Sequence, residues 1–140
     1  MRIRLLALST VACLLAGCLP ASDDIEWKEV TTSSATAEGN AQSETAYAIE
    51  QFLRAQGWSK RGGSDPGGGV RRWYESSNAP GTRVVVNNDA SRGCFNFAVF
   101  VDAKAPEASY GRAINSAFVS EFGMKPGWRV MSGTPCPVGG

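Results

Sequence analysis

The chain has 140 residues, enough for one small domain, with a formal net charge of +1 and no histidine. Without histidine, Ser-His-Asp triads, imidazole acid–base catalysis and Cys/His metal sites are all excluded. The near-neutral charge hides a split, because residues 18–50 carry seven acidic residues and one lysine, whereas residues 51–140 carry eleven basic and six acidic residues. A basic excess of this size does not by itself require an anionic partner.

The first 17 residues have the pattern of a secretory signal peptide. Arg2 and Arg4 precede an apolar run, Leu5 to Leu15, that is too short to span a bilayer. The run ends in Leu15-Ala16-Gly17-Cys18, which closely resembles the lipobox of bacterial lipoproteins. The resemblance implies a diacylglyceryl group on the Cys18 sulfur, cleavage before Cys18, and acylation (for example by palmitate) of the freed amine. By resemblance to the sorting of such lipoproteins, Leu19 rather than aspartate after the cysteine points to the outer membrane, with the protein facing the periplasm.

The four cysteines have different expected fates. Cys13 leaves with the signal peptide, and Cys18 would carry the lipid. The alternative for Cys18, an ordinary cysteine behind an ordinary signal peptide, would need an Ala-x-Ala-like site, and none ends near it. Cys94 and Cys136 remain in an oxidising compartment, so we predict a disulfide between them. A thiol nucleophile is the alternative, but no histidine is present to activate it.

Residues 18–42 are rich in Ser, Thr, Ala, Asp and Glu, and this composition predicts a flexible acidic tether. Ile25 and Trp27 interrupt it with apolar side chains at alternate positions. The interpretation we favour places Trp27 at the lipid headgroups or loosely on the domain, and the alternative is a docking strand for a partner. A single domain is expected over residues 43–140.

The first predicted helix of this domain runs from Glu44 to Gln56, with Ser43 as its cap. Gly57 follows at the position where a left-handed residue ends a helix, and Trp58 is placed to make the usual hydrophobic contact. The glycine-rich run at 62–69 lacks the Gly-Lys-Ser/Thr ending of a phosphate-binding loop. We therefore predict a mobile connection there.

Three strands joined by hairpin turns are predicted next, at Val70–Glu75, Thr82–Asn87 and Cys94–Asp102. A second helix begins near Pro106 and ends at Gly123, before a last short strand. The order α-β-β-β-α-β predicts an α+β fold, with a four-stranded, mainly antiparallel sheet and two helices on one face.

The last strand is predicted at Trp128–Ser132, and the disulfide constrains its direction. For Cys136 to reach Cys94, either the last strand runs antiparallel to the third strand, or the tail after Gly133 folds back along the sheet. We predict antiparallel neighbours.

The two faces of the predicted sheet carry different side chains. Alternation predicts that one set of side chains faces the helices, namely Trp73, Val84, Val86, Phe97, Val99 and Val130. It leaves on the opposite face Arg72, Tyr74, Arg83, Val85, Asn96, Phe100, Arg129 and Met131. Such a mixture is typical of an interface, although a merely solvated face also carries some of each and the register of the first strand is ambiguous. We predict partner contacts through Arg72, Tyr74, Arg83, Phe100 and Arg129.

Chemistry-bearing motifs are few. The carboxylates form no spaced pair, and no cofactor loop or metal-ligand set is present, so we expect no catalytic site, no cofactor and no metal. Arg71-Arg72-Trp73-Tyr74 has the basic–aromatic mixture of nucleic-acid binders, but an exported protein meets little nucleic acid.

Three functional hypotheses follow. The first is a non-enzymatic, lipid-anchored accessory that binds a protein in the periplasm: an envelope-assembly accessory, an immunity protein, or an inhibitor of a lytic enzyme. The second is a binder of anionic lipid or lipopolysaccharide headgroups through Arg72, Arg83 and Arg129. The third is a minor hydrolase that uses Asp102, Glu107 or Glu121.

Overall fold

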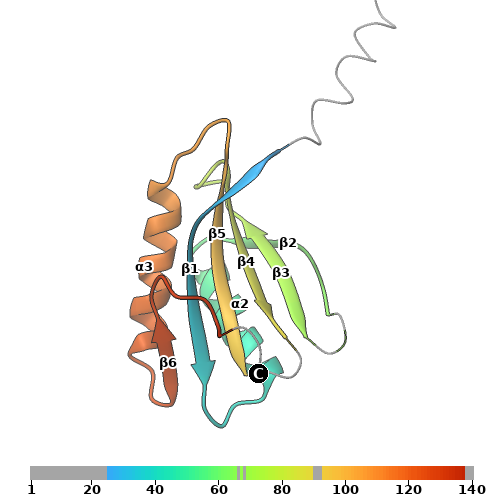
Figure 1. Ribbon diagram of the computed structural model, residues 1–140, viewed down its shortest axis with the longest axis vertical. Helices are drawn as coiled ribbons and strands as arrows, with labels where there is room; N and C mark the ends of the chain where they lie inside the picture. The colour runs from blue at the N-terminus through green and yellow to red at the C-terminus, as the bar shows by residue number, and fades with distance from the viewer. Residues whose placement is uncertain (1–24, 66, 68, 90–92, 138–140) are drawn as a thin grey trace, which may run out of the picture.

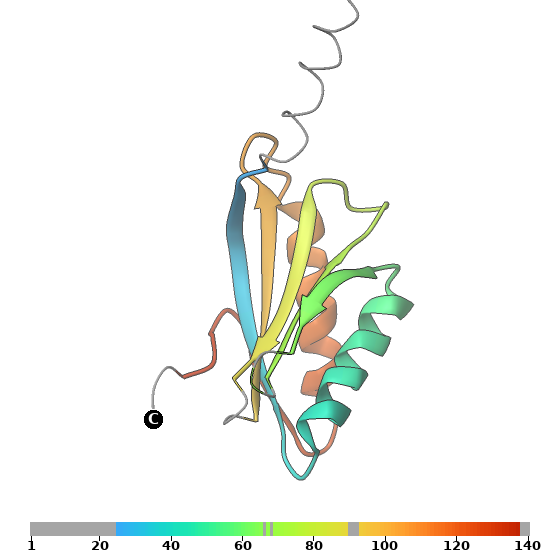
Figure 2. The ribbon, with the colours of Figure 1, turned by 90° about the vertical axis from the view of Figure 1, so that its right-hand side faces the viewer.

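The computed structural model describes residues 25–65, 67, 69–89 and 93–137, so the predicted signal peptide and Cys18 lie outside the described residues. Two helices and six strands follow one another along this part of the chain: β1 (Trp27–Ala37), α2 (Gln42–Ala55), β2 (Ser59–Ser64), β3 (Val70–Glu75), β4 (Thr82–Asn88), β5 (Cys94–Asp102), α3 (Ser109–Gly123) and β6 (Trp128–Met131). The strands form one antiparallel sheet in the order β2-β3-β4-β5-β1-β6 (Figure 1). Both helices cover the same face of this sheet (Figure 2). Neither helix is long and apolar enough to cross a membrane.

The α+β class is confirmed, but the sheet has six strands where we predicted four. The strands predicted at 70–75 and 94–102 have the expected bounds, and β4 is one residue longer than expected. Helix α3 begins at Ser109, three residues later than Pro106. The two additional strands, β1 and β2, lie in segments where we predicted a tether and a mobile connection.

Strand β1 corrects the prediction that residues 18–42 form a flexible tether throughout. It lies between β5 and β6, antiparallel to both. Its buried side chains are small, including Ser33 and Ala35, because helix α3 crosses this part of the sheet. The Ser33 hydroxyl donates a hydrogen bond of 2.7 Å to Asn115 Oδ1 on α3. A buried strand of small and polar residues lacks the alternation of large apolar side chains by which strands are recognised.

Strand β2 corrects the prediction of a mobile connection at 62–69. It forms one edge of the sheet and pairs with β3, with an irregularity in register between Lys60 and Gly62. Gly62 is required because the Trp73 ring lies on it, so that an added Cβ would come within 2.2 Å of the ring. The glycines that indicated mobility therefore allow close packing between two strands.

Helix α2 ends as its sequence predicted. Gly57 has a positive φ of 87°, and its N–H donates to the carbonyl of Arg54. The Trp58 N–H donates to the carbonyl of Leu53, which completes a Schellman motif. Trp58 is buried, so the end of the helix is fixed against the core.

The core lies between the helices and the sheet and is mainly aromatic. Phe118 of α3 stacks on Phe97 of β5 with ring centroids 4.0 Å apart, and it contacts Phe52 of α2 at 6.1 Å and Phe122 at 5.1 Å. Phe122 stacks in turn on Trp128 of β6. Both helices are therefore joined to the sheet through one aromatic cluster.

The predicted disulfide between Cys94 and Cys136 is present, with the two Cα atoms 5.9 Å apart. The predicted strand arrangement is wrong, because β1 separates β5 from β6 and both run antiparallel to β1. The tail after Gly133 instead folds back over the sheet, on the face away from the helices (Figure 2). Cys136 thus reaches Cys94 at the start of β5 although β5 and β6 run in the same direction.

Candidate functional site

The face of the sheet opposite the helices, called the open face below, is where the polar and aromatic side chains of five strands meet. The buried residues of the opposite face, such as Val84, Phe97 and Val99, determine which side chains of each strand lie on the open face. Arg83 and Phe100 lie side by side on it as a register pair of β4 and β5. No helix of the described chain covers this face (Figure 2).

At one end of the open face, an arginine is held between two tryptophans. The guanidinium carbon of Arg83 lies 4.3 Å from the ring centre of Trp27 and 5.9 Å from that of Trp73. Its Nε and Nη2 atoms donate to Glu75 Oε1 at 3.1 and 2.7 Å. Trp27, Trp73, Glu75 and Arg83 form what we call the arginine–tryptophan cluster. Cation–π and ionic contacts hold its side chains in one arrangement, as preorganised binding surfaces require.

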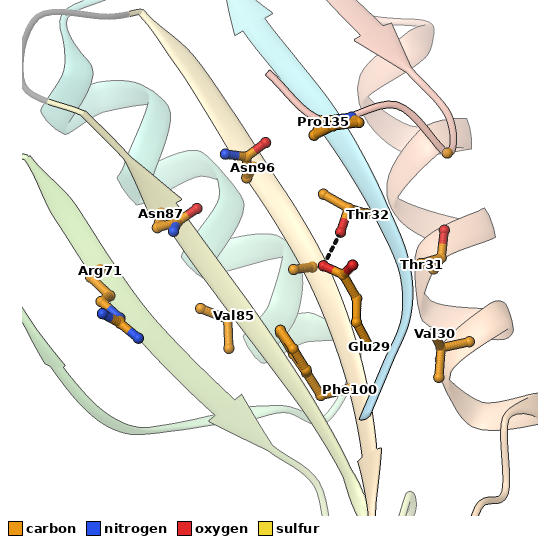
Figure 3. A pocket seen from close by; sticks show the side chains of 12 residues that line it. Glu29, Val30, Thr31, Thr32, Arg71, Val85, Asn87, Asn96, Phe100 and Pro135 are labelled. Carbon is orange, nitrogen blue, oxygen red and sulfur yellow. Dashed lines mark hydrogen bonds between the residues drawn. The ribbon is translucent and has the colours of Figure 1, made fainter. Parts of the chain in front are cut away.

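Beside this cluster lies a groove of about 560 Å³. Strands β4 and β5 form its floor, whose apolar part consists of Val85, Ala98 and Phe100. Figure 3 labels Val85 and Phe100, together with Asn87 and Asn96 on the same two strands. Arg71 lies on the β3 side, and Glu29 lies on the β1 side, where its Oε1 accepts a hydrogen bond of 2.5 Å from the Thr32 hydroxyl (Figure 3). The groove therefore combines an apolar floor with a cation and an anion on opposite sides.

The C-terminal tail forms part of the groove through Gly133 and Pro135. Two contacts besides the disulfide hold the tail in place. The Gly133 N–H donates to the Ser33 hydroxyl at 3.2 Å, and the Cys136 N–H donates to Asn96 Oδ1 at 2.7 Å. The shape of the groove thus depends on the disulfide.

The structure brings together only some of the side chains that we predicted as contact residues. Arg83 and Phe100 lie on the open face as predicted, and Arg129 lies on it at the edge strand β6. Arg129 is three strands away from Arg83, which corresponds to about 14 Å across the sheet. Arg129 and Arg83 therefore do not form one basic site.

The prediction for β3 is wrong by one residue in register. Tyr74 pairs with the buried Val84, is 1% exposed, and faces the helices, so it is no surface contact residue. Arg72 lies on the same side as Tyr74, with its Nη2 3.6 Å from Asp65 Oδ2. Trp73, which we directed toward the helices, lies on the open face. The reason is that Tyr74 carries a hydroxyl that finds a partner in α2, whereas Trp73 finds flat packing space over Gly62.

Tyr74 belongs to a buried polar network below the sheet. Its hydroxyl donates to Glu50 Oε1 at 3.3 Å, and Lys60 and Arg54 lie 3.5 and 3.8 Å from the Glu50 carboxylate. Burial, and then the negative charge of Glu50, raise the pKa of Tyr74 to about 12 from the ordinary 10.0. The network attaches α2 to the β2–β3 hairpin and carries no accessible chemistry.

The raised pKa of Tyr74 predicts a loss of stability in alkali. The contribution of neutral Tyr74 is complete below pH 10 and is lost as the pH rises from about 10 to 12, because the unfolded chain releases the phenolic proton first. In Tyr74→Phe we expect the free energy of unfolding at neutral pH to fall by about 0.5–1.5 kcal/mol, the value of one hydrogen bond. The difference between the wild type and this variant should then shrink between pH 10 and 12, as measured by urea denaturation. Tyr47→Phe, at an exposed tyrosine, is the control and should parallel the wild type; a pH-independent difference for Tyr74→Phe would contradict the assignment.

Sequence reasoning missed three residues of the open face: Trp73, Arg71 and Glu29. Trp27, which we placed at the lipid headgroups or loosely on the domain, is the first residue of β1 and packs on Arg83, whereas Ile25 precedes the strand. No sequence signal identified Glu29, because a register shift follows it between Glu29 and Thr31.

Comparison of the chain with protein-family models, curated proteins and solved structures gives no match. Among the residues that the structure describes, no three Cys, Asp or Glu side chains are grouped closely enough to hold a metal ion.

Proposed function

We propose that this protein is a non-enzymatic, lipid-anchored binding protein of the bacterial cell envelope, attached to the outer membrane through Cys18 and facing the periplasm. It binds a protein partner through the open face of its sheet. The observation that carries the proposal is the arginine–tryptophan cluster beside an apolar-floored groove. Tryptophan and other aromatic side chains, together with arginine, dominate the energetics of protein interfaces. Here two tryptophans and an arginine are clustered and held in place.

The lipid anchor would contribute to binding without adding a contact. Confining the protein to a membrane surface raises its effective concentration for any partner that works at that surface. An envelope-assembly accessory, an immunity protein and an inhibitor of a lytic enzyme all act on such partners. Each of these is favoured over the hydrolase, because the three carboxylates of that hypothesis make local contacts: Asp102 and Glu107 accept backbone hydrogen bonds from Lys104 and Ser109, and Glu121 lies 3.9 Å from Lys125.

The charges of the open face favour a protein partner over anionic headgroups. Arg83 is neutralised by Glu75 at 2.7 Å, and Arg72 lies on the other side of the sheet beside Asp65. Only Arg129 of the three arginines in the headgroup hypothesis lies on the open face without such a carboxylate. A polyanionic surface is best recognised by several convergent cations, whereas the described arginines of this face that no carboxylate neutralises, Arg71 on β3 and Arg129 on β6, lie four strands apart.

Position-specific crosslinking in intact cells tests the proposed face. A photoreactive amino acid at Val85 or Thr32, both on the open face, should give a covalent adduct of one defined mass, whereas the same amino acid at the exposed Tyr47 of α2 should not. Phe100→Ala should reduce the yield at both open-face positions. Adducts that form equally from Tyr47, or only with lipid, would contradict the proposal.

Cys18→Ser tests the anchor. Three acyl chains hold a protein at a bilayer far more firmly than the roughly 10⁴ M⁻¹ of a single myristoyl chain, so their loss should move the protein from the membrane fraction to the soluble fraction. Cell fractionation and the mass of the mature N-terminus measure this. Cys13→Ser is the matched control, because Cys13 lies in the predicted signal peptide and should leave membrane attachment unchanged. Membrane association that persists in Cys18→Ser would show that the anchor lies elsewhere.

A further inference from the structure

We infer that the groove of the open face recognises an extended peptide segment of the partner, with a basic residue and an acidic residue four positions apart and an apolar residue midway between them. The inference rests on the proposed function, since it names the chemistry of the partner at the same face. It assigns Arg71 to the acidic side chain, Glu29 to the basic side chain, and the floor of Val85, Ala98 and Phe100 to the apolar side chain.

The two charges of the groove are available to a ligand. Within the described part of the chain, Arg71 is exposed and no ion pair or side-chain hydrogen bond engages it. Glu29 is also exposed and receives only the neutral hydroxyl of Thr32, which orients the carboxylate without neutralising it. A cation and an anion on opposite sides of one groove complement a ligand that carries both charges.

The spacing of the two charges selects the length of the ligand. Arg71 on β3 and Glu29 on β1 are three strands apart, about 14 Å, and their register partners on β5, Asn96 and Phe100, are four residues apart, about 13 Å. Their α-carbons are thus separated by about 20 Å along a diagonal, and long side chains shorten the gap between the charges. Residues four apart in an extended peptide are about 13 Å apart and point to the same side.

The groove also suits the peptide between these charges. The residue midway between the charged ones points to the same side as they do, toward the apolar floor. Two asparagine side chains that line the groove suit hydrogen bonds to a peptide backbone. Asn87 offers both groups of its amide. Asn96 offers its NH₂ group, because its carbonyl oxygen already accepts a hydrogen bond from the Cys136 N–H. An oligosaccharide fits less well, because Arg83 packs against both Trp27 and Trp73, the two indoles of the open face.

Fluorescence anisotropy with the full-length lipidated protein in mild detergent tests the inference. The probes are labelled peptides with blocked ends, Lys-Ser-Val-Ser-Glu and its reverse Glu-Ser-Val-Ser-Lys. Saturable binding of one of them is expected. Arg71→Gln should weaken binding about two- to fivefold, the range for an exposed ion pair, and should have no effect on a probe in which glutamine replaces glutamate. Glu29→Gln should act in the same way on the lysine of the probe.

Arg129→Gln is the matched control, since Arg129 lies on the open face but outside the groove, and it should leave the affinity unchanged. The inference is overturned if neither probe binds. It is also overturned if Arg71→Gln weakens binding of the glutamine probe as much as binding of the glutamate probe. Calorimetric binding of chitotriose in place of either peptide would overturn it in favour of a saccharide. The crosslinking result at Val85 and Thr32 does not depend on the peptide or saccharide measurements. Failure of the peptide inference can therefore be distinguished from failure of the proposed function.

Discussion

Replacing Phe118 by alanine should lower the free energy of unfolding by about 3–5 kcal/mol. Phe118 is fully buried and contacts Phe52, Phe97 and Phe122, so it joins both helices to the sheet. The substitution removes a large apolar side chain and leaves a cavity that three rings from three elements cannot all fill. Chemical denaturation followed by tryptophan fluorescence measures the change.

Tyr47→Ala on α2 is the control for this prediction. Its side chain is 62% exposed, so the change should stay within about 0.5 kcal/mol. A Phe118→Ala variant as stable as Tyr47→Ala would mean that the aromatic cluster is not the core of this domain. If Phe118→Ala is too unstable to purify, Phe118→Leu is measured instead. It should lower the free energy of unfolding less than alanine does.

Removal of the disulfide is the second large effect. Cys94→Ala should lower the free energy of unfolding by about 2–5 kcal/mol, because the bond closes a loop between residues 42 positions apart and fixes a tail whose described residues, 132–137, form no strand. The same variant should release Gly133 and Pro135 from the groove and reduce crosslinking from Thr32.

Two comparisons isolate the effect of the bond itself. The double variant Cys94→Ala/Cys136→Ala should match Cys94→Ala, since either change removes the whole disulfide. A reducing agent should destabilise the wild type and leave both variants unchanged. Equal melting temperatures of the wild type with and without reductant would refute the predicted stabilisation.

The sequence predicted those elements whose signals are local. Helix α2 has an apolar stripe and a glycine stop, and β5 alternates Phe95, Phe97, Val99 and Val101 on its buried face, so both were found. Each of these signals arises from one element that packs large side chains against a shared core.

The missed elements depend on neighbours distant in sequence. Strand β1 contains Ser33 and Ala35 where a core strand ordinarily has large residues, because α3 lies close above it and supplies Asn115 as a polar partner. Gly111 of α3 allows a similar close approach to the neighbouring strand β5, since an added Cβ would lie 2.6 Å from Val99 Cγ1. No reading of residues 27–37 alone identifies a strand whose small side chains are explained by a helix some 80 positions later.

The candidate site was predicted in part for a related reason. Arg83, Phe100 and Arg129 were placed correctly because the apolar residues of β4, β5 and β6 define which side is buried. In β3, both Trp73 and Tyr74 are large aromatic residues, so alternation alone does not decide which of them faces the core. The Glu50 carboxylate on α2 and the bare surface of Gly62 on β2 decide it, and both belong to other elements.

The position at which β1 begins sets how far an anchored protein would extend from the bilayer. A spacer that lasted to residue 42 would allow a span of about 80 Å, whereas the nine steps from Cys18 to Trp27 allow at most about 30 Å. Because β1 pairs with β5 from Trp27 onward, and also with β6 from Ser34 to Ala37, further length is gained only by breaking the pairing of β1 with β5. A protein attached in this way would stay within a thin layer next to the lipid, and it would meet only partners that reach that layer.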